Sequence, residues 1–172
     1  MTIAYSAARW TDYAAAAVGA GTTLSGLVFV AVSINLSRIL GHPSLPVRAW
    51  QTLGLLVTPM LIGFFLLVPG QSRTLLAWEL VVSAVIFTGA RVALDHQSVP
   101  SEKATPLPLV GRLAGLVSAL LPALVSYACL AVAGATLLAQ SGGGLYWLVP
   151  SVLLAILFGL INAWALLVEI PL

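Results

Sequence analysis

The sequence predicts an all-α integral membrane protein, a compact bundle of five transmembrane helices. Only 7% of its 172 residues are charged and 60% are hydrophobic, whereas about a quarter of a soluble domain is charged. Its apolar runs continue for about 20 residues or more, the length that crosses a ~30 Å hydrocarbon core. Strands of a membrane β-barrel would instead alternate over ~10 residues. Because lipid supplies no hydrogen-bond partners, each run is expected to satisfy its own backbone as a helix.

We expect one transmembrane domain covering residues 1–172, with helices at about 14–40, 47–68, 75–94, 109–140 and 145–168. Glycine and proline mark the short turns between them. The longest connection, 95–108, holds several prolines and both signs of charge, and we expect it to be a solvated cytoplasmic loop. The first run is nearly twice as long as the apolar part of a signal peptide, so we expect it to be a helix of the mature protein.

The positive charges predict the orientation of the bundle. Two lie on the side of the N-terminus and five on the opposite side: Arg9 and Arg73, against Arg38, Arg48, Arg91, Lys103 and Arg112. Since cytoplasmic loops carry the excess of Lys and Arg, the N-terminus is expected outside and the C-terminus in the cytoplasm. Tryptophans are expected at both interfaces, with Trp50 and Trp164 near the inner one. The small net charge of +2 is read as a topology signal, and no nucleic-acid partner is expected.

Small and weakly polar residues recur at spacings of three and four along the fourth helix, which places them on one face. The candidates are Gly111, Gly115, Ser118, Ser126, Cys129 and Thr136. Such a stripe either lets another helix approach closely or lines a narrow path, and packing is the more common use. The first helix has a similar face, expected to contact the fourth helix or another subunit: Ala15, Gly19, Thr22 and Gly26.

Three amides, Asn35, Gln51 and Asn162, are expected at similar depth in the inner half of the bundle. An amide in lipid is costly unless it is paired, so each should face the interior and bond across helices. The layer is interpreted either as an interhelical clamp or as the constriction of a path. The spacing does not separate these two alternatives.

Two ionisable residues fall inside predicted helices, Glu79 near the outer end and Arg91 near the inner end. Arg73 is a possible partner of Glu79, and Asp95 is placed for an i, i+4 pair with Arg91. Interfacial ion pairs account for both residues without a function. The functional alternative makes Glu79 part of a cation-attracting ring in an oligomer.

The chain has no phosphate-binding loop, no nucleophile motif and no paired Cys and His at ligand spacing, so no cofactor, metal or enzymatic activity is expected. Asp95 and His96 would have to carry the chemistry of any lipid- or quinone-modifying enzyme. The leading hypothesis is a small homo-oligomeric channel or transporter for an ion or small solute, in a bacterial inner membrane. The alternative is a non-transporting scaffold or regulatory subunit that binds lipid or a partner membrane protein.

Overall fold

The computed structural model describes residues 3–42, 45–97 and 109–169, and the side-chain surroundings of these residues except 96–97, 109–119 and 169. Within these ranges the chain is helical and contains no strand. Five of the described helices are long and apolar enough to cross a membrane, which confirms the predicted fold class at that level. The long helices are α1 (Thr11–Ile34), α3 (Leu45–Leu67), α4 (Arg73–Gln97), α5 (Leu109–Ala139) and α6 (Leu148–Glu169). Four short elements accompany them: η1 (Ile3–Tyr5), η2 (Ala7–Arg9), α2 (Leu36–Leu40) and η3 (Gly144–Trp147).

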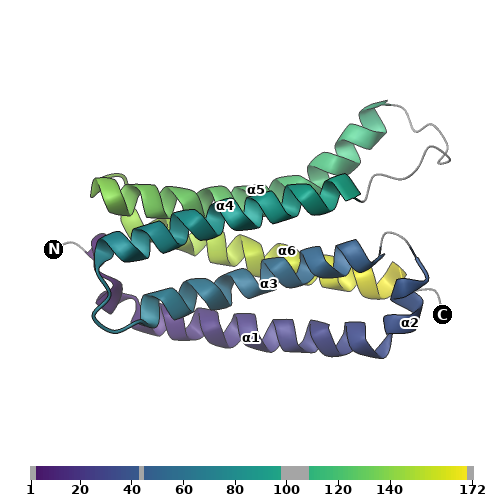
Figure 1. Ribbon diagram of the computed structural model, residues 1–172, viewed down its shortest axis with the longest axis horizontal. Helices are drawn as coiled ribbons and strands as arrows, with labels where there is room; N and C mark the ends of the chain where they lie inside the picture. The colour runs from purple at the N-terminus through teal and green to yellow at the C-terminus, as the bar shows by residue number, and fades with distance from the viewer. Residues whose placement is uncertain (1–2, 43–44, 98–108, 170–172) are drawn as a thin grey trace.

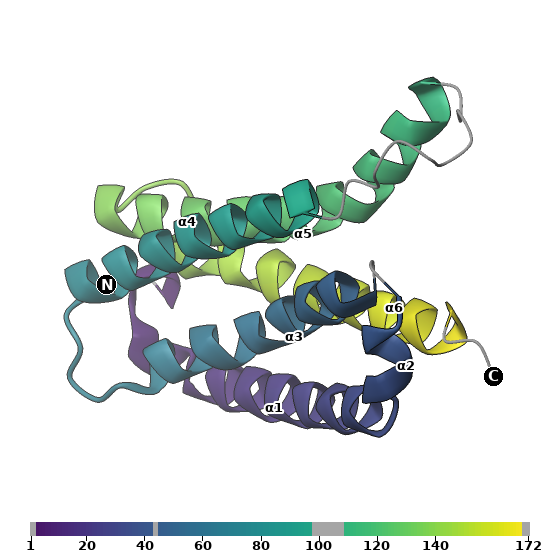
Figure 2. The same cartoon turned by 45° about the vertical axis from the view of Figure 1, so that its right-hand side comes forward.

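The helix expected over 14–40 is divided at Asn35. Its backbone leaves the helical region, with φ −102° and ψ 15°, and its side-chain Nδ2 donates to the carbonyl of Ala31 at 3.0 Å. Asparagine favours such breaks because its short side chain competes for backbone groups. The chain then restarts as the short helix α2, which lies across the end of the bundle (Figures 1 and 2).

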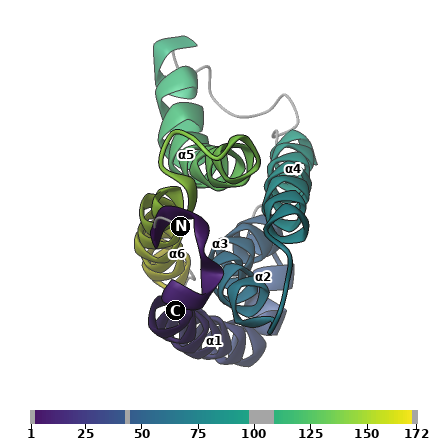
Figure 3. The same ribbon diagram turned by 90° about the vertical axis from the view of Figure 1, so that its left-hand side faces the viewer.

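The long helices form two pairs that α6 joins. α1 packs most extensively on α3, and α4 on α5, while α6 packs on both α3 and α5. The view along the bundle in Figure 3 shows α6 beside both groups. We call the end with η3 and the α3–α4 turn the η3 end, and the end with α2 and the C-terminus of α6 the α2 end (Figure 1).

Glycines permit the closest contacts within the pairs. A Cβ atom at Gly63 would lie 2.6 Å from the carbonyl oxygen of Ala14, so α1 and α3 meet backbone against backbone. A Cβ atom at Gly134 would lie 2.7 Å from the carbonyl oxygen of Ala77, which brings α5 equally close to α4. Small residues give apolar helices van der Waals contact where lipid supplies no hydrophobic drive.

Packing differs between the two halves. In the η3 half one apolar core takes side chains from every long helix, among them Ala14, Ile62, Leu80, Leu130 and Leu148, each at most 1% exposed. From the middle toward the α2 end, the buried residues divide into three smaller clusters. α5 contains Pro122, which removes a backbone hydrogen bond and favours a bend. Its first turns point away from the other helices (Figure 2).

Large apolar side chains cover the outside of the bundle. Each long helix exposes at least one that is more than half accessible: Leu27, Trp50, Val85, Leu121 and Leu153. Soluble monomers rarely expose contiguous apolar surface on this scale. The described surface is therefore compatible with a multi-pass membrane protein.

Candidate functional site

A buried ion pair lies near the α2 end of α4. Arg91 Nε contacts Asp95 Oδ2 at 3.0 Å, one turn further along the helix. The Arg91 side chain is only 4% exposed and that of Asp95 is 17% exposed. The i, i+4 pair predicted from the spacing is thus present, with its arginine buried and its carboxylate partly buried. Ionisable groups inside apolar helices are costly, and they commonly mark a functional position.

Gln51 connects this pair to another helix. Its Nε2 donates to Asp95 Oδ1 at 2.7 Å, so that α3 is joined to α4 by a polar contact. Each carboxylate oxygen of Asp95 thereby accepts a hydrogen bond, Oδ1 from α3 and Oδ2 from α4. From the sequence, Gln51 was assigned to a layer of amides and Arg91 to the ionisable residues within helices. In the structure both side chains contact the Asp95 carboxylate. We call Gln51, Arg91 and Asp95 the polar network.

An aromatic contact lies on the η3 side of the polar network. Tyr127 of α5, 3% exposed, stacks on Phe87 of α4 with ring centroids 5.6 Å apart. Phe87 lies one helical turn before Arg91 on α4, so an aromatic contact between α4 and α5 adjoins the network, whose polar groups come from α3 and α4. Chemically, the arrangement offers a positive and a negative group in a region of low polarity, where electrostatic contacts are strong.

The other two amides of the expected layer do not join the network among the described side chains. Asn35 bonds the carbonyl of Ala31 on its own helix. Asn162 is half-buried on α6. An amide at a helix end can hydrogen-bond to a carbonyl of its own helix. Counting residues estimates the depth of a side chain in the bundle but does not reveal this local hydrogen bond.

At Ser126, the stripe on α5 is a packing face against α6. Ser126 Oγ donates to the carbonyl of Ser151 on α6 at 2.8 Å, and both residues are fully buried. Thr136 bonds the Val132 carbonyl of its own helix at 2.7 Å, and Cys129 is half-buried. Three further candidates lie on α5, but their side chains fall outside the described residues: Gly111, Gly115 and Ser118.

Sequence reasoning missed the glycine that brings α5 closest to α4. Gly134 lies beside the chosen stripe, and its Cβ position meets Ala77 and Val81. The run of small residues from Ala133 to Ala135 was a signal that could have identified it. By contrast, a Cβ at Gly19 or Gly26 of α1 would meet no atom within 4 Å, and both glycines are exposed. That face of α1 therefore does not contact α5 in this structure.

At the η3 end, Glu79 accepts a hydrogen bond from Nε2 of Gln71. Arg73, the partner expected for Glu79, instead faces the side-chain oxygen of Gln140 once that amide is oriented to satisfy both groups. Gln140 has φ +54°, and the N–H of Ser141 donates to the carbonyl of Thr136 at 3.3 Å. This left-handed ending satisfies a terminal carbonyl of α5.

No group of three His, Cys, Asp or Glu residues within the described ranges could hold a metal ion. His96, the partner proposed for Asp95 in an enzyme, has a side chain outside the described set. In comparisons with known families, curated proteins and solved structures, the chain matches none. The function is therefore argued from the geometry.

Proposed function

We propose that this chain is a multi-pass membrane protein that transports a small solute or ion. The polar network carries the proposal, because it places a buried cation and a carboxylate inside helices that are mostly apolar. Groups of this kind in membrane spans commonly belong to substrate or proton pathways. The network also joins α3 to α4 at the end of the bundle where the apolar core is divided.

The difference between the two halves favours a transporter that alternates between states over an open channel. The η3 half is filled by one core from all the long helices. α3 and α4 make a smaller contact with each other than either makes with its own pair partner. We propose that α4 and α5 move against α1, α3 and α6, and that the Gln51–Asp95 hydrogen bond closes the α2 end in the state described here.

The proposed setting is a bacterial inner membrane, with the α2 end in the cytoplasm. The exposed apolar side chains on every long helix support insertion, and the excess of arginine and lysine on the α2 side supports the orientation. We further propose a homo-oligomer. Its support is the exposed face of α1 that carries Gly19 and Gly26, around which the chain itself leaves open space.

Cysteine accessibility tests the alternating model. In a Cys129→Ala background, Ala123→Cys and Ala133→Cys place thiols on α5 ten positions apart. Both alanines are buried, at 1% and 0% exposure, but Ala123 lies in the divided region and Ala133 in the shared core. We expect a membrane-impermeant thiol reagent, supplied from the α2 side, to label the cysteine at 123 and not the one at 133.

Equal protection of the two thiols would contradict the model and favour the non-transporting scaffold or regulatory subunit. The packing of Ser126 against α6 is compatible with that alternative, because it identifies part of the α5 stripe as structural. Labelling that depends on the side of reagent addition also tests the orientation. Flux measurements in proteoliposomes with a panel of ions and small solutes then identify what is carried.

A further inference from the structure

An apolar groove of about 510 Å³ lies on the outside of the bundle between α1 and α6. Its lining is entirely apolar in residue type and includes an exposed tryptophan: Leu24, Leu27, Val28, Ala31, Leu160, Ile161, Ala163, Trp164 and Leu167. The groove extends along each helix for the rise between residues seven positions apart, which is ~10 Å. That is about two-thirds of one leaflet of a ~30 Å hydrocarbon core.

The groove exists because α1 and α6 both pack on α3 but make little contact with each other. Where they face one another, Ala31 and Ala163 are too short to fill the space between them. The groove follows the direction of the helices, which is also the direction of an acyl chain in a bilayer. Its lining is almost wholly apolar and suits a hydrocarbon chain better than a water-soluble ligand.

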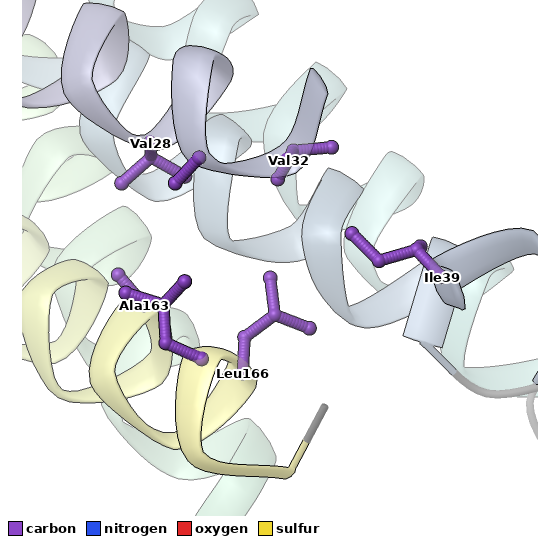
Figure 4. Close-up of a pocket in the computed structure, with 7 residues that line it drawn as sticks. Val28, Val32, Ile39, Ala163 and Leu166 are labelled. Carbon is purple, nitrogen blue, oxygen red and sulfur yellow. The ribbon is translucent and has the colours of Figure 1, made fainter. Parts of the chain in front are cut away.

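The groove continues toward the α2 end as a smaller hollow. Figure 4 shows the side chains around it: Val28 and Val32 of α1, Ile39 of α2, and Ala163 and Leu166 of α6. Because the chain turns at Asn35, α2 lies beyond this hollow and places Ile39 in its wall. The neighbouring Arg38 is exposed on α2. Arg38 directly precedes the wall residue Ile39, so a cationic residue stands at the end of the apolar groove, where a lipid headgroup would lie.

We propose that this groove binds one acyl chain of an anionic membrane phospholipid, with its phosphate held near Arg38. The apolar lining selects a hydrocarbon chain, and the charge of Arg38 selects an anionic headgroup over a zwitterionic one. The site rests on the membrane insertion proposed above but not on transport. Bound lipid fills the space between α1 and α6 and supports the group made by α1, α3 and α6.

Two tryptophans provide a matched test. Trp164 lines the groove and is 71% exposed, whereas Trp50 on α3 is 68% exposed and lies outside its lining. Variants that keep only one of them, with the other tryptophans replaced by phenylalanine, are placed in vesicles that mix phosphatidylglycerol and phosphatidylcholine. Either lipid carries bromine on its acyl chains, and tryptophan quenching reports which one is adjacent. Circular dichroism confirms that each variant retains its helices.

At Trp164 we expect a preference for phosphatidylglycerol about fivefold greater than at Trp50, the effect of one arginine near an anionic headgroup. Arg38→Gln should abolish that difference, while Arg9→Gln, an exposed arginine at the η3 end, should leave it unchanged. Equal preference at both tryptophans, or no response to Arg38→Gln, overturns the lipid site alone. If brominated lipids quench neither tryptophan, the membrane insertion in the proposed function fails as well.

Discussion

The η3 half and the α2 half of the bundle are held together by different forces. In the η3 half, buried apolar residues from all the long helices form one core, and Gly63 and Gly134 bring the helices of each pair into backbone contact. Toward the α2 end, buried apolar residues form small separate clusters, and a Gln51–Asp95 hydrogen bond joins α3 to α4.

This difference has mechanical consequences. A close-packed core resists small displacements, because each one forfeits many dispersion contacts. A few polar contacts can exchange between discrete arrangements, and interhelical hydrogen bonds in membrane proteins contribute only about 0.6 kcal/mol on average. The η3 half is therefore suited to act as a fixed base, and the α2 half to move.

The largest expected effect comes from removing the buried cation. Arg91→Met removes the guanidinium that contacts Asp95 Oδ2 and should lower the free energy of unfolding by about 3 kcal/mol, the lower end for a buried pair, because Asp95 is 17% exposed. The double variant Arg91→Met, Asp95→Leu should recover most of that loss, because neither charge remains. Reversible unfolding in detergent micelles measures both. A single variant as stable as the parent would show that the network contributes little to the fold.

The next effect tests the fixed base. Gly63→Ala places a methyl group against the Ala14 carbonyl and should cost about 1–3 kcal/mol through overpacking. Gly54→Ala is the matched control on the same helix, since no atom lies within 4 Å of its Cβ position. It should change stability by less than about 0.5 kcal/mol. Similar losses in both variants would argue against close α1–α3 packing.

A smaller effect is expected at the contact between α5 and α6. Ser126→Ala removes the hydrogen bond to the Ser151 carbonyl and should cost about 0.6–1.7 kcal/mol. Thr136→Ala loses only a bond to its own helix, so its unfolding free energy should stay nearer the parent value. If Thr136→Ala lowers the free energy of unfolding more than Ser126→Ala does, Ser126 is not the packing position on this stripe.

The smallest effect concerns motion at the α2 end. Gln51→Leu removes the bond from α3 to Asp95 and leaves the Arg91 pair in place. The labelling rate of a cysteine at Ala123 should rise about threefold, which corresponds to ~0.6 kcal/mol for one interhelical hydrogen bond. The cysteine at Ala133 should remain protected. An unchanged rate at 123 would show that Gln51 does not restrain the opening.

The sequence by itself determined the helical class, the number of long apolar helices and their approximate limits. These follow from local quantities: hydropathy, run length, and the glycines and prolines between runs. The spacing of Arg91 and Asp95 likewise determined their ion pair, because residues four apart on a helix are neighbours. The break at Asn35 was missed, since it depends on which acceptor one side chain selects.

Only the tertiary structure decided which faces meet. Gly19 and Gly63 are both helical glycines, yet α3 brings Gly63 against α1 and leaves Gly19 in open space on the other side. Gln51 and Asp95 are 44 positions apart, and only the crossing of α3 and α4 brings them within hydrogen-bond distance. In an almost uniformly apolar chain, polarity does not distinguish the inner face of a helix from the outer one. The choice is made by shape, through small residues and a few polar contacts between helices.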